Sequence, residues 1–500
     1  MSFQEAFFWT VLRSLAAAGL AVPMSLWLSR VVQQATGRSR FGWLLLVLLP
    51  LLAPDLIVGY SYRSFELSLL HRPVLNHCFY FLLALLKFLP AAVVVRICSP
   101  PASVSAAALH CARVARRRCE LWPRFRNMQL KSELLKHLPV SGVVFLLTMQ
   151  EFEIASLLQI PAWTVHLFDA QAGGLMPAGT FRTLVLPVLA QSAVLLPVVW
   201  CVLVNVQQAP PRWRIGDAES TSACWPGILV ACAATILLWI VPLSVVSWSG
   251  FPAMMDVLRN EILVRSTLLD LGAALAISLP CAVLSLVVAR RLRPIALAGG
   301  EQRRAAEYLS SAATILAMVP GLFGALSVSM AVLFALQHPP LTELRSTLWP
   351  MAVALILFLI PRAFLLTLLV PSRRNLEACH LAAMLRASAD HNQRQSAAGL
   401  EWWYEARPMF VVAVVLFYWS LANLTAAALL CPPTIPLLSF EGNIVPLPVR
   451  LYKFIHQGRT ATLSLMALLS VVAPLLLVVL VSWIAPRLYE RFSAPRTSHS

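Results

Sequence analysis

The sequence has few charged residues and lacks the loop that most ATP-hydrolysing enzymes use. Asp, Glu, Lys and Arg make up 12% of the 500 residues, whereas soluble globular proteins carry about 25%. This shortage excludes a water-soluble enzyme and a disordered chain. No Gly-Lys dipeptide occurs, so the chain has no P-loop. We therefore expect a protein that is not an enzyme.

Patterns that would predict a metal site, a disulfide framework or a catalytic centre are also missing. The ten cysteines include no CxxC pair, and several lie inside apolar segments, as Cys201 and Cys281 do. We therefore expect these thiols to be buried and unreactive. No HExxH or Gly-x-Ser-x-Gly motif occurs. We predict no metal, no catalytic residue and no cofactor bound by this chain.

Apolar residues, in contrast, are abundant and gathered in long segments. They make up 59% of the chain, and the mean hydropathy is +0.76. A helix needs about 20 apolar residues to cross a bilayer, and the sequence contains about eleven such segments. They predict an all-α polytopic membrane protein with spans near residues 8–28, 42–61, 77–95, 138–158, 183–206, 225–248, 267–288, 309–337, 349–370, 408–430 and 462–483.

The distribution of basic residues predicts the orientation of these spans. Of the 39 Lys and Arg residues, 26 lie in connections on one side of the membrane and nine in connections on the other. Because cytoplasmic connections carry the excess of basic residues, the N-terminus is predicted outside and the C-terminus in the cytoplasm. This rule also explains the net charge of +17 without a nucleic-acid partner.

The chain also contains an internal repeat of five spans. Matched positions keep their order while the offset between the copies grows from 257 to 284 residues. They are Pro23 with Pro280, Pro54 with Pro320, Pro90 with Pro361, 151–158 with 423–430, and 164–168 with 448–452. A sixth span returns the chain to the starting side, so the copies are parallel. We predict a first repeat at 1–206, a linker and linking helix at 207–250, and a second repeat at 251–500.

Three features together resemble a known family. The first is the order of helices in each copy, with a long basic cytoplasmic connection (99–137 and 372–407) between the third and fourth helices. The second is the segment 446–452, followed by 456–459, before the last helix. The third is the connection itself, where the family carries the EAA motif. On these features the chain resembles the fused two-copy permeases of binding-protein-dependent ABC importers, similar to the ferric-iron type.

In that family the EAA connection forms a coupling helix that docks on a cytoplasmic ATPase. The first connection departs from the motif: the frame begins at Ala112, Arg118 stands at the glycine position, and Leu130 matches a later position. Trp122 and Phe125 fall where the family often has aromatic residues. An arginine at the glycine position crowds the turn, since glycine adopts backbone conformations that other residues resist.

The second connection keeps more of the motif at its start. Glu377 and Ala378 open it and Ala383 takes the glycine position, but the expected Ile-x-Leu-Pro falls on unrelated residues. The resemblance implies a permease subunit that forms a solute pathway in a bacterial inner membrane. It also implies two partners, an ABC ATPase dimer in the cytoplasm and an extracytoplasmic solute-binding protein, and suggests ferric iron or another small solute.

Five residues within spans are candidates for the pathway. Glu151 and Glu153 lie in the fourth span, and Glu151 aligns with Asn423. They either line the pathway or are hydrated near the outer interface. Lys87 and Arg362 lie near the middle of the two third spans. Each either contacts an anion or an acidic partner, or is a structural charge satisfied by carbonyls that a nearby proline frees.

Two other functions remain open from the sequence alone. Charges inside the membrane favour a secondary transporter driven by an ion gradient. The degenerate EAA connections favour a permease-derived scaffold that no longer transports. The family's usual half has six helices, so the helix count is eleven or twelve.

Overall fold

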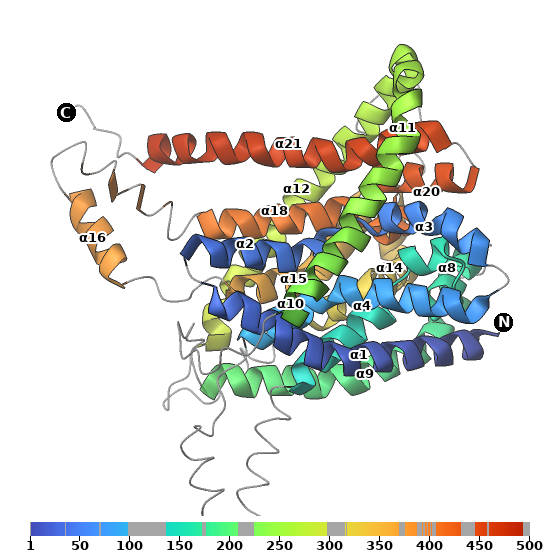
Figure 1. The fold of residues 1–500 in the computed structure, drawn as a ribbon, viewed down its shortest axis with the longest axis horizontal. Coiled ribbons are helices and arrows are strands. Elements are labelled where there is room, and N and C mark those ends of the chain that lie inside the picture. The colour runs from blue at the N-terminus through green and yellow to red at the C-terminus, as the bar shows by residue number, and fades with distance from the viewer. Residues whose placement is uncertain are drawn as a thin grey trace, which may run out of the picture. The chain divides into compact units, whose positions relative to one another are not determined.

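Helices make up nearly all of the secondary structure in the computed structural model (Figure 1). It describes residues 2–35, 37–69, 72–98, 137–172, 177–208, 225–297, 318–369, 376–387, 407–431, 446–457 and 460–493, with a few single residues between 316 and 402. No strand occurs within these ranges.

The first half alternates long helices with broken ones. Two long helices, α1 and α4, flank a broken second helix, and a broken fourth helix leads through a short helix to the long α9. In order they are α1 (Phe3–Gln34), α2 (Gly37–Leu48), η1 (Leu49–Leu52), α3 (Asp55–Leu69), α4 (Pro73–Cys98), an unlabelled helix (His137–Met149), α7 (Glu153–Leu157), α8 (Trp163–Ala172) and α9 (Pro177–Gln208).

A continuous helical segment links the halves, and the second half has a similar order. The linking segment is α10 (Trp225–Thr235), the π-helical turn η2 (Ile236–Ile240) and α11 (Val241–Arg259). The second half contains α12 (Glu261–Leu297), α14 (Gly324–Ala335), η3 (Pro339–Ser346), α15 (Trp349–Leu369), α16 (Leu376–Ala387), α18 (Arg407–Leu421), α19 (Leu424–Leu430), α20 (Leu447–Gln457) and α21 (Thr460–Ser493).

Seven of the described helices are long and apolar enough to cross a membrane, and up to ten if each of three bent pairs is one span. The bent pairs are α2–η1 with α3 (68°), α14 with η3 (120°), and α18 with α19 (50°). A further apolar helix, His137–Met149, is shorter. Each predicted span overlaps one of these helices. The expectation of an all-α polytopic membrane protein is confirmed at this level.

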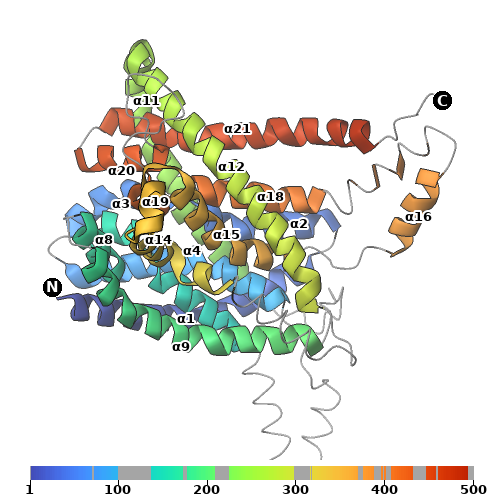
Figure 2. The ribbon, with the colours of Figure 1, turned by 180° about the vertical axis from the view of Figure 1, so that it is seen from behind.

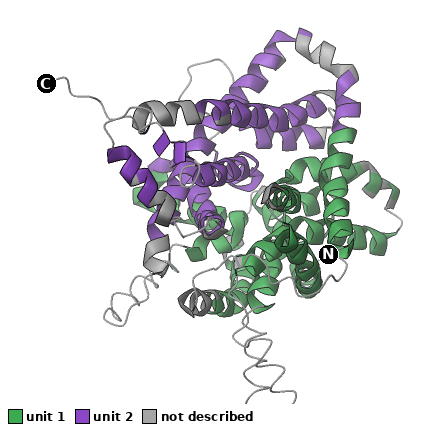
Figure 3. Ribbon diagram, turned by 60° about the vertical axis from the view of Figure 1, so that its left-hand side comes forward, with its two compact units in different colours: residues 1–245, 294–342 green, residues 246–293, 343–500 purple. Residues whose placement is uncertain are grey.

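By contacts between helices, the chain divides into two compact units (Figure 3). Unit 1 contains residues 1–245 and 294–342, and unit 2 contains residues 246–293 and 343–500. The units do not follow the predicted repeats, because residues 294–342 belong to the second repeat but pack with the first. Within unit 1 this packing brings α14 against α9.

Small residues let α1 approach its neighbours closely in unit 1. Ala17 and Ala21 are buried where α1 packs on α4. On α10, a Cβ atom at Gly227 would lie 2.8 Å from the backbone carbonyl oxygen of Trp27. Without water to drive apolar surfaces together, close contact of this kind is what holds membrane helices to each other.

Hydrogen bonds attach the linking segment to the broken second helix. The Trp239 indole N–H donates to the Leu49 carbonyl over 2.7 Å, and the Tyr62 hydroxyl donates to the Leu237 carbonyl over 2.7 Å. Trp239 and Leu237 both lie in η2, where the π-helical turn departs from the regular α-helical pairing of backbone groups. Side chains of the linking segment and of the broken second helix thus donate hydrogen bonds to backbone carbonyl groups of the other.

Candidate polar site at the broken helices of unit 1

The break in the second helix forms around Pro54. Proline has no backbone N–H and disfavours helical backbone at the residue before it. Ala53 accordingly has extended backbone, and α3 begins at Asp55 after a bend of 68°. Such a break exposes carbonyl groups that must find donors elsewhere in a membrane protein.

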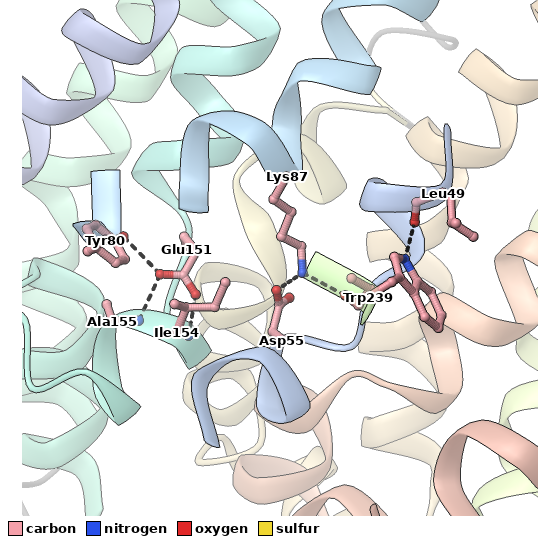
Figure 4. Close-up of polar contacts among 9 residues, drawn as sticks. Leu49, Asp55, Tyr80, Lys87, Glu151, Ile154, Ala155 and Trp239 are labelled. Atoms are coloured by element: carbon pink, nitrogen blue, oxygen red, sulfur yellow. Dashed lines mark hydrogen bonds and ion pairs between the residues drawn. The ribbon is translucent and has the colours of Figure 1, made fainter. Parts of the chain in front are cut away.

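Lys87 supplies both a donor and a charge at this break (Figure 4). Its side chain is 4% exposed and extends from the middle of α4. The ammonium forms an ion pair with the Asp55 carboxylate and donates to the Ala53 carbonyl oxygen over 2.9 Å. Lys87 therefore combines two of the arrangements considered from the sequence, an acidic partner and a carbonyl beside a proline. The proline is Pro54, rather than Pro90 of its own helix.

Glu151 lies at a second break, between His137–Met149 and α7. Its carboxylate accepts from the backbone N–H groups of Ile154 (2.6 Å) and Ala155 (3.0 Å), and from the Tyr80 hydroxyl (2.9 Å) (Figure 4). The Glu151 carbonyl accepts from the Thr164 hydroxyl over 2.8 Å. A carboxylate at the start of a helix satisfies N–H groups that have no partner inside the helix.

Glu153 is the first residue of α7 and is also buried, 8% exposed against 5% for Glu151. Both carboxylates at this break are thus buried among apolar helices, whereas the Asp55 side chain at the other break is 29% exposed. The burial of Glu151 and Glu153 fits a pathway lining or a structural network better than hydration at the outer interface.

Arg13 joins this network, a role that the sequence did not indicate. Its guanidinium donates to the Pro161 carbonyl over 2.6 Å and lies 3.3 Å from His77 Nδ1. It also covers the Tyr80 ring, 5.1 Å from the ring centre. Arg13 thus connects α1 to the segment that leads into α8.

In unit 2, Asn423 occupies a break of the same kind between α18 and α19, the two helices labelled in Figure 2. It precedes α19, and its side-chain oxygen accepts from the Ala426 backbone N–H over 2.9 Å. Glu151 caps the N–H group three residues ahead, and so does Asn423. The two residues were aligned from the sequence, and the structure places both as caps of a short helix after a bend.

A second local correspondence involves the first long helix of each half. Asp270 on α12 forms an ion pair with Arg450 on α20 inside unit 2. With the offset of 257 residues, Asp270 corresponds to Arg13. The Arg13 guanidinium donates to the Pro161 carbonyl, just before α8. With the offset of 284, the start of α20 at Leu447 corresponds to the start of α8 at Trp163. In each half a charged side chain of the first helix attaches the short helix before the last span.

This ion pair leads to a test by substitution. Arg450→Met should reduce the free energy of unfolding by about 3 kcal/mol or more, because it removes the ion-pair partner Arg450 from the fully buried Asp270 carboxylate. Asp270→Asn should cost less, since the Arg450 side chain is 19% exposed. Denaturant unfolding in detergent measures both. Lys453→Met, on the exposed side of α20, is the matched control, and equal losses for Arg450→Met and Lys453→Met would contradict the prediction.

Arg362 contacts its own helix. Its guanidinium donates to the Phe358 carbonyl over 2.8 Å and stacks on the Phe358 ring at 3.6 Å. Pro361 has no backbone N–H, so it leaves the carbonyl of Leu357, four residues earlier, without its helical donor. Arg362 contacts the next carbonyl, that of Phe358. The arginine therefore binds its own helix beside the proline, but not at the carbonyl that the proline frees.

The predicted coupling connections lie largely outside the described residues. This is so for Ala112, Arg118, Trp122, Phe125 and Leu130. Glu377, Ala378 and Ala383 lie on α16, whose backbone is described. Their contact with an ATPase stays a prediction.

The described side chains of this site offer fixed charges and hydrogen bonds within an apolar interior. Among the described residues, no group of three or more His, Cys, Asp or Glu side chains could hold a metal ion. The arrangement suits holding a polar or charged group within the membrane.

In comparisons with known proteins, no family, no curated protein and no solved structure matches this chain.

Proposed function

We propose that this chain is the membrane-spanning permease subunit of an ABC importer in a bacterial inner membrane, with its C-terminus in the cytoplasm. A separate ATPase dimer would dock at 112–131 and 377–404, and an extracytoplasmic binding protein would deliver ferric iron or another small solute. The solute would cross by alternating access, driven by ATP binding and hydrolysis in the partner.

One observation supports this proposal: residues that the sequence aligns between the two halves make similar local contacts. Each half has a long first helix and, later, a break followed by a short capped helix, a second short helix and a long last helix. Glu151 and Asn423 cap equivalent short helices, and Arg13 and Asp270 attach equivalent short helices. Duplicated halves of this kind suit a pathway between them.

The test is capture of the ATPase by photo-crosslinking. A crosslinking residue replaces Trp122 in one variant and Glu377 in another, and captured proteins are identified by mass spectrometry after solubilisation of native membranes. Capture of one P-loop ATPase at both positions is the expected result. A crosslinker at the exposed Glu343 in η3, predicted on the opposite side, should not capture it. Absence of an ATPase at both positions, in an inserted and folded protein, would overturn the proposal.

A gradient-driven carrier is the second candidate, favoured by the charges that lie at the breaks of unit 1. Asp55, Lys87 and Glu151 meet irregular backbone inside the membrane, where transporters often bind coupling ions. Transport that survives ATP depletion but stops when the proton gradient collapses would favour this function over the importer. A folded protein that transports in neither assay would be the scaffold.

A further inference from the structure

Gln150 connects two helix breaks that come from different halves of the chain but lie in unit 1. It follows the helix His137–Met149 directly, at the break before α7. Its side-chain N–H₂ group donates to the Leu322 carbonyl, just before α14, and to Gln191 Oε1 on α9 over 3.0 Å. A single amide thus joins the broken fourth helix to α9 and to the start of α14.

These bonds determine how both amides are oriented. The Leu322 carbonyl can only accept, so the nitrogen end of Gln150 must face it. Because that nitrogen also faces Gln191, the oxygen end of Gln191 must face Gln150. The N–H₂ group of Gln191 is therefore not the end of this amide that bonds to Gln150. Gln191 is fully buried, and its Nε2 atom has no hydrogen-bond acceptor among the described residues.

The start of α14 adds further donors at this place. Gly324, the first residue of α14, has φ = +89°, and a Cβ atom there would lie 2.7 Å from Gln150 Oε1. The Gln150 side chain therefore packs against the first residue of α14. The N-cap residue, Phe323, provides no side-chain hydrogen bond. The first N–H groups of a helix carry partial positive charge and attract anions.

Two buried hydroxyl groups lie on separate helices whose neighbouring residues belong to the same apolar cluster. Ser327 is buried one turn after Phe323 on α14, and its hydroxyl has no partner in the described part of the chain. Ser14 on α1 is likewise buried without a described partner. Helical spacing places Ser14 on the same face as Val11 and Ala18, which pack in one apolar cluster with Leu322, Phe323, Val194 and Leu195.

We propose that this region, defined by Gln150, Gln191, Ser14, Ser327 and the N-terminus of α14, binds a carboxylate group. The Gln191 amide can only donate from its free end, the helix N-terminus donates, and both hydroxyls are able to donate. A buried donor without a partner costs about 1–3 kcal/mol, and a carboxylate accepts up to four hydrogen bonds. The same donors disfavour a cation. That the carboxylate belongs to a transported solute rests on the function proposed above.

Binding of acetate to the purified full-length chain in nanodiscs tests the site. Acetate should raise the melting temperature in a saturable way, by about 1–2 °C, while its neutral isostere acetamide should not. Gln191→Leu removes the buried donor with an apolar replacement of similar size. It should weaken acetate binding about tenfold or more, since a hydrogen bond to a charged group contributes roughly 1.5–3 kcal/mol.

Two further variants make the outcome decisive. Gln337→Leu changes an exposed residue just after the C-terminal end of α14 and should leave the response to acetate unchanged. Ser327→Ala should weaken acetate binding severalfold and serves if Gln191→Leu does not fold. Equal responses to acetate and acetamide, or an unchanged response in both site variants, would overturn the proposal. The assay needs no ATPase, so its outcome is separate from that of the crosslinking experiment.

Discussion

Replacing Lys87 with methionine is expected to lower the free energy of unfolding by about 3–5 kcal/mol. The change removes the only ammonium that the structure places at the break beside Asp55, among the residues described there. The Asp55 carboxylate and the Ala53 carbonyl would then remain inside the membrane without their donor. Methionine has a similar length, so loss of packing contributes little to the expected effect.

A double-mutant cycle separates the ion pair from other effects of the substitution. Asp55→Asn combined with Lys87→Met removes both charges and should recover a large part of the stability lost in Lys87→Met alone. Reversible unfolding in mixed micelles provides the four free energies. If the two single losses simply add in the double variant, the ion pair is not what holds the break, and the interpretation of Lys87 fails.

Replacing Glu151 with alanine should cost about 2–4 kcal/mol, because the carboxylate accepts two backbone N–H groups and the Tyr80 hydroxyl. All three donors would be left buried. Asn423→Ala removes the corresponding cap in unit 2 and should cost about 1 kcal/mol, since Asn423 is neutral and caps one described N–H group.

The same unfolding measurement compares these two caps. Glu151→Gln keeps one acceptor oxygen in place and should have an intermediate stability. Tyr80→Phe should lose less than Glu151→Ala, because only one hydrogen bond disappears. An Asn423→Ala variant that is destabilised more than Glu151→Ala would show that charge and the number of donors do not determine the strength of these caps.

Hydropathy alone predicted where the apolar helices lie, because each predicted span is a local property of about 20 residues. The interruptions at Pro54 and before Glu153 were less predictable, since a proline within an apolar segment either kinks a helix or is tolerated inside it. Pro23 and Pro90 lie within continuous helices, whereas Pro54 ends one. The difference depends on the side chains that satisfy the freed backbone groups.

The candidate site was predicted only in part, because the sequence shows where charges lie but not which distant groups they contact. Lys87, Glu151 and Glu153 stand out in the sequence because charges are rare within spans. Arg13 lies nearer a helix end, where contact with lipid headgroups is the usual expectation, and Gln150 and Gln191 are polar without being charged. Their roles depend on contacts over 148, 172 and 41 residues of sequence, which no local pattern records.

The composition of unit 1 also constrains the order of events during synthesis. Because unit 1 includes residues 294–342, it cannot be completed when the ribosome has finished the first repeat and the linking segment. The Leu322 carbonyl that receives the Gln150 amide, and the helix that covers α9, are made about 170 residues after Gln150 itself. At the usual rate of about 5–20 residues per second, the polar break of the fourth helix waits on the order of ten seconds or more for its partner. During that interval the membrane insertion machinery, or a chaperone in the membrane, would have to shield it.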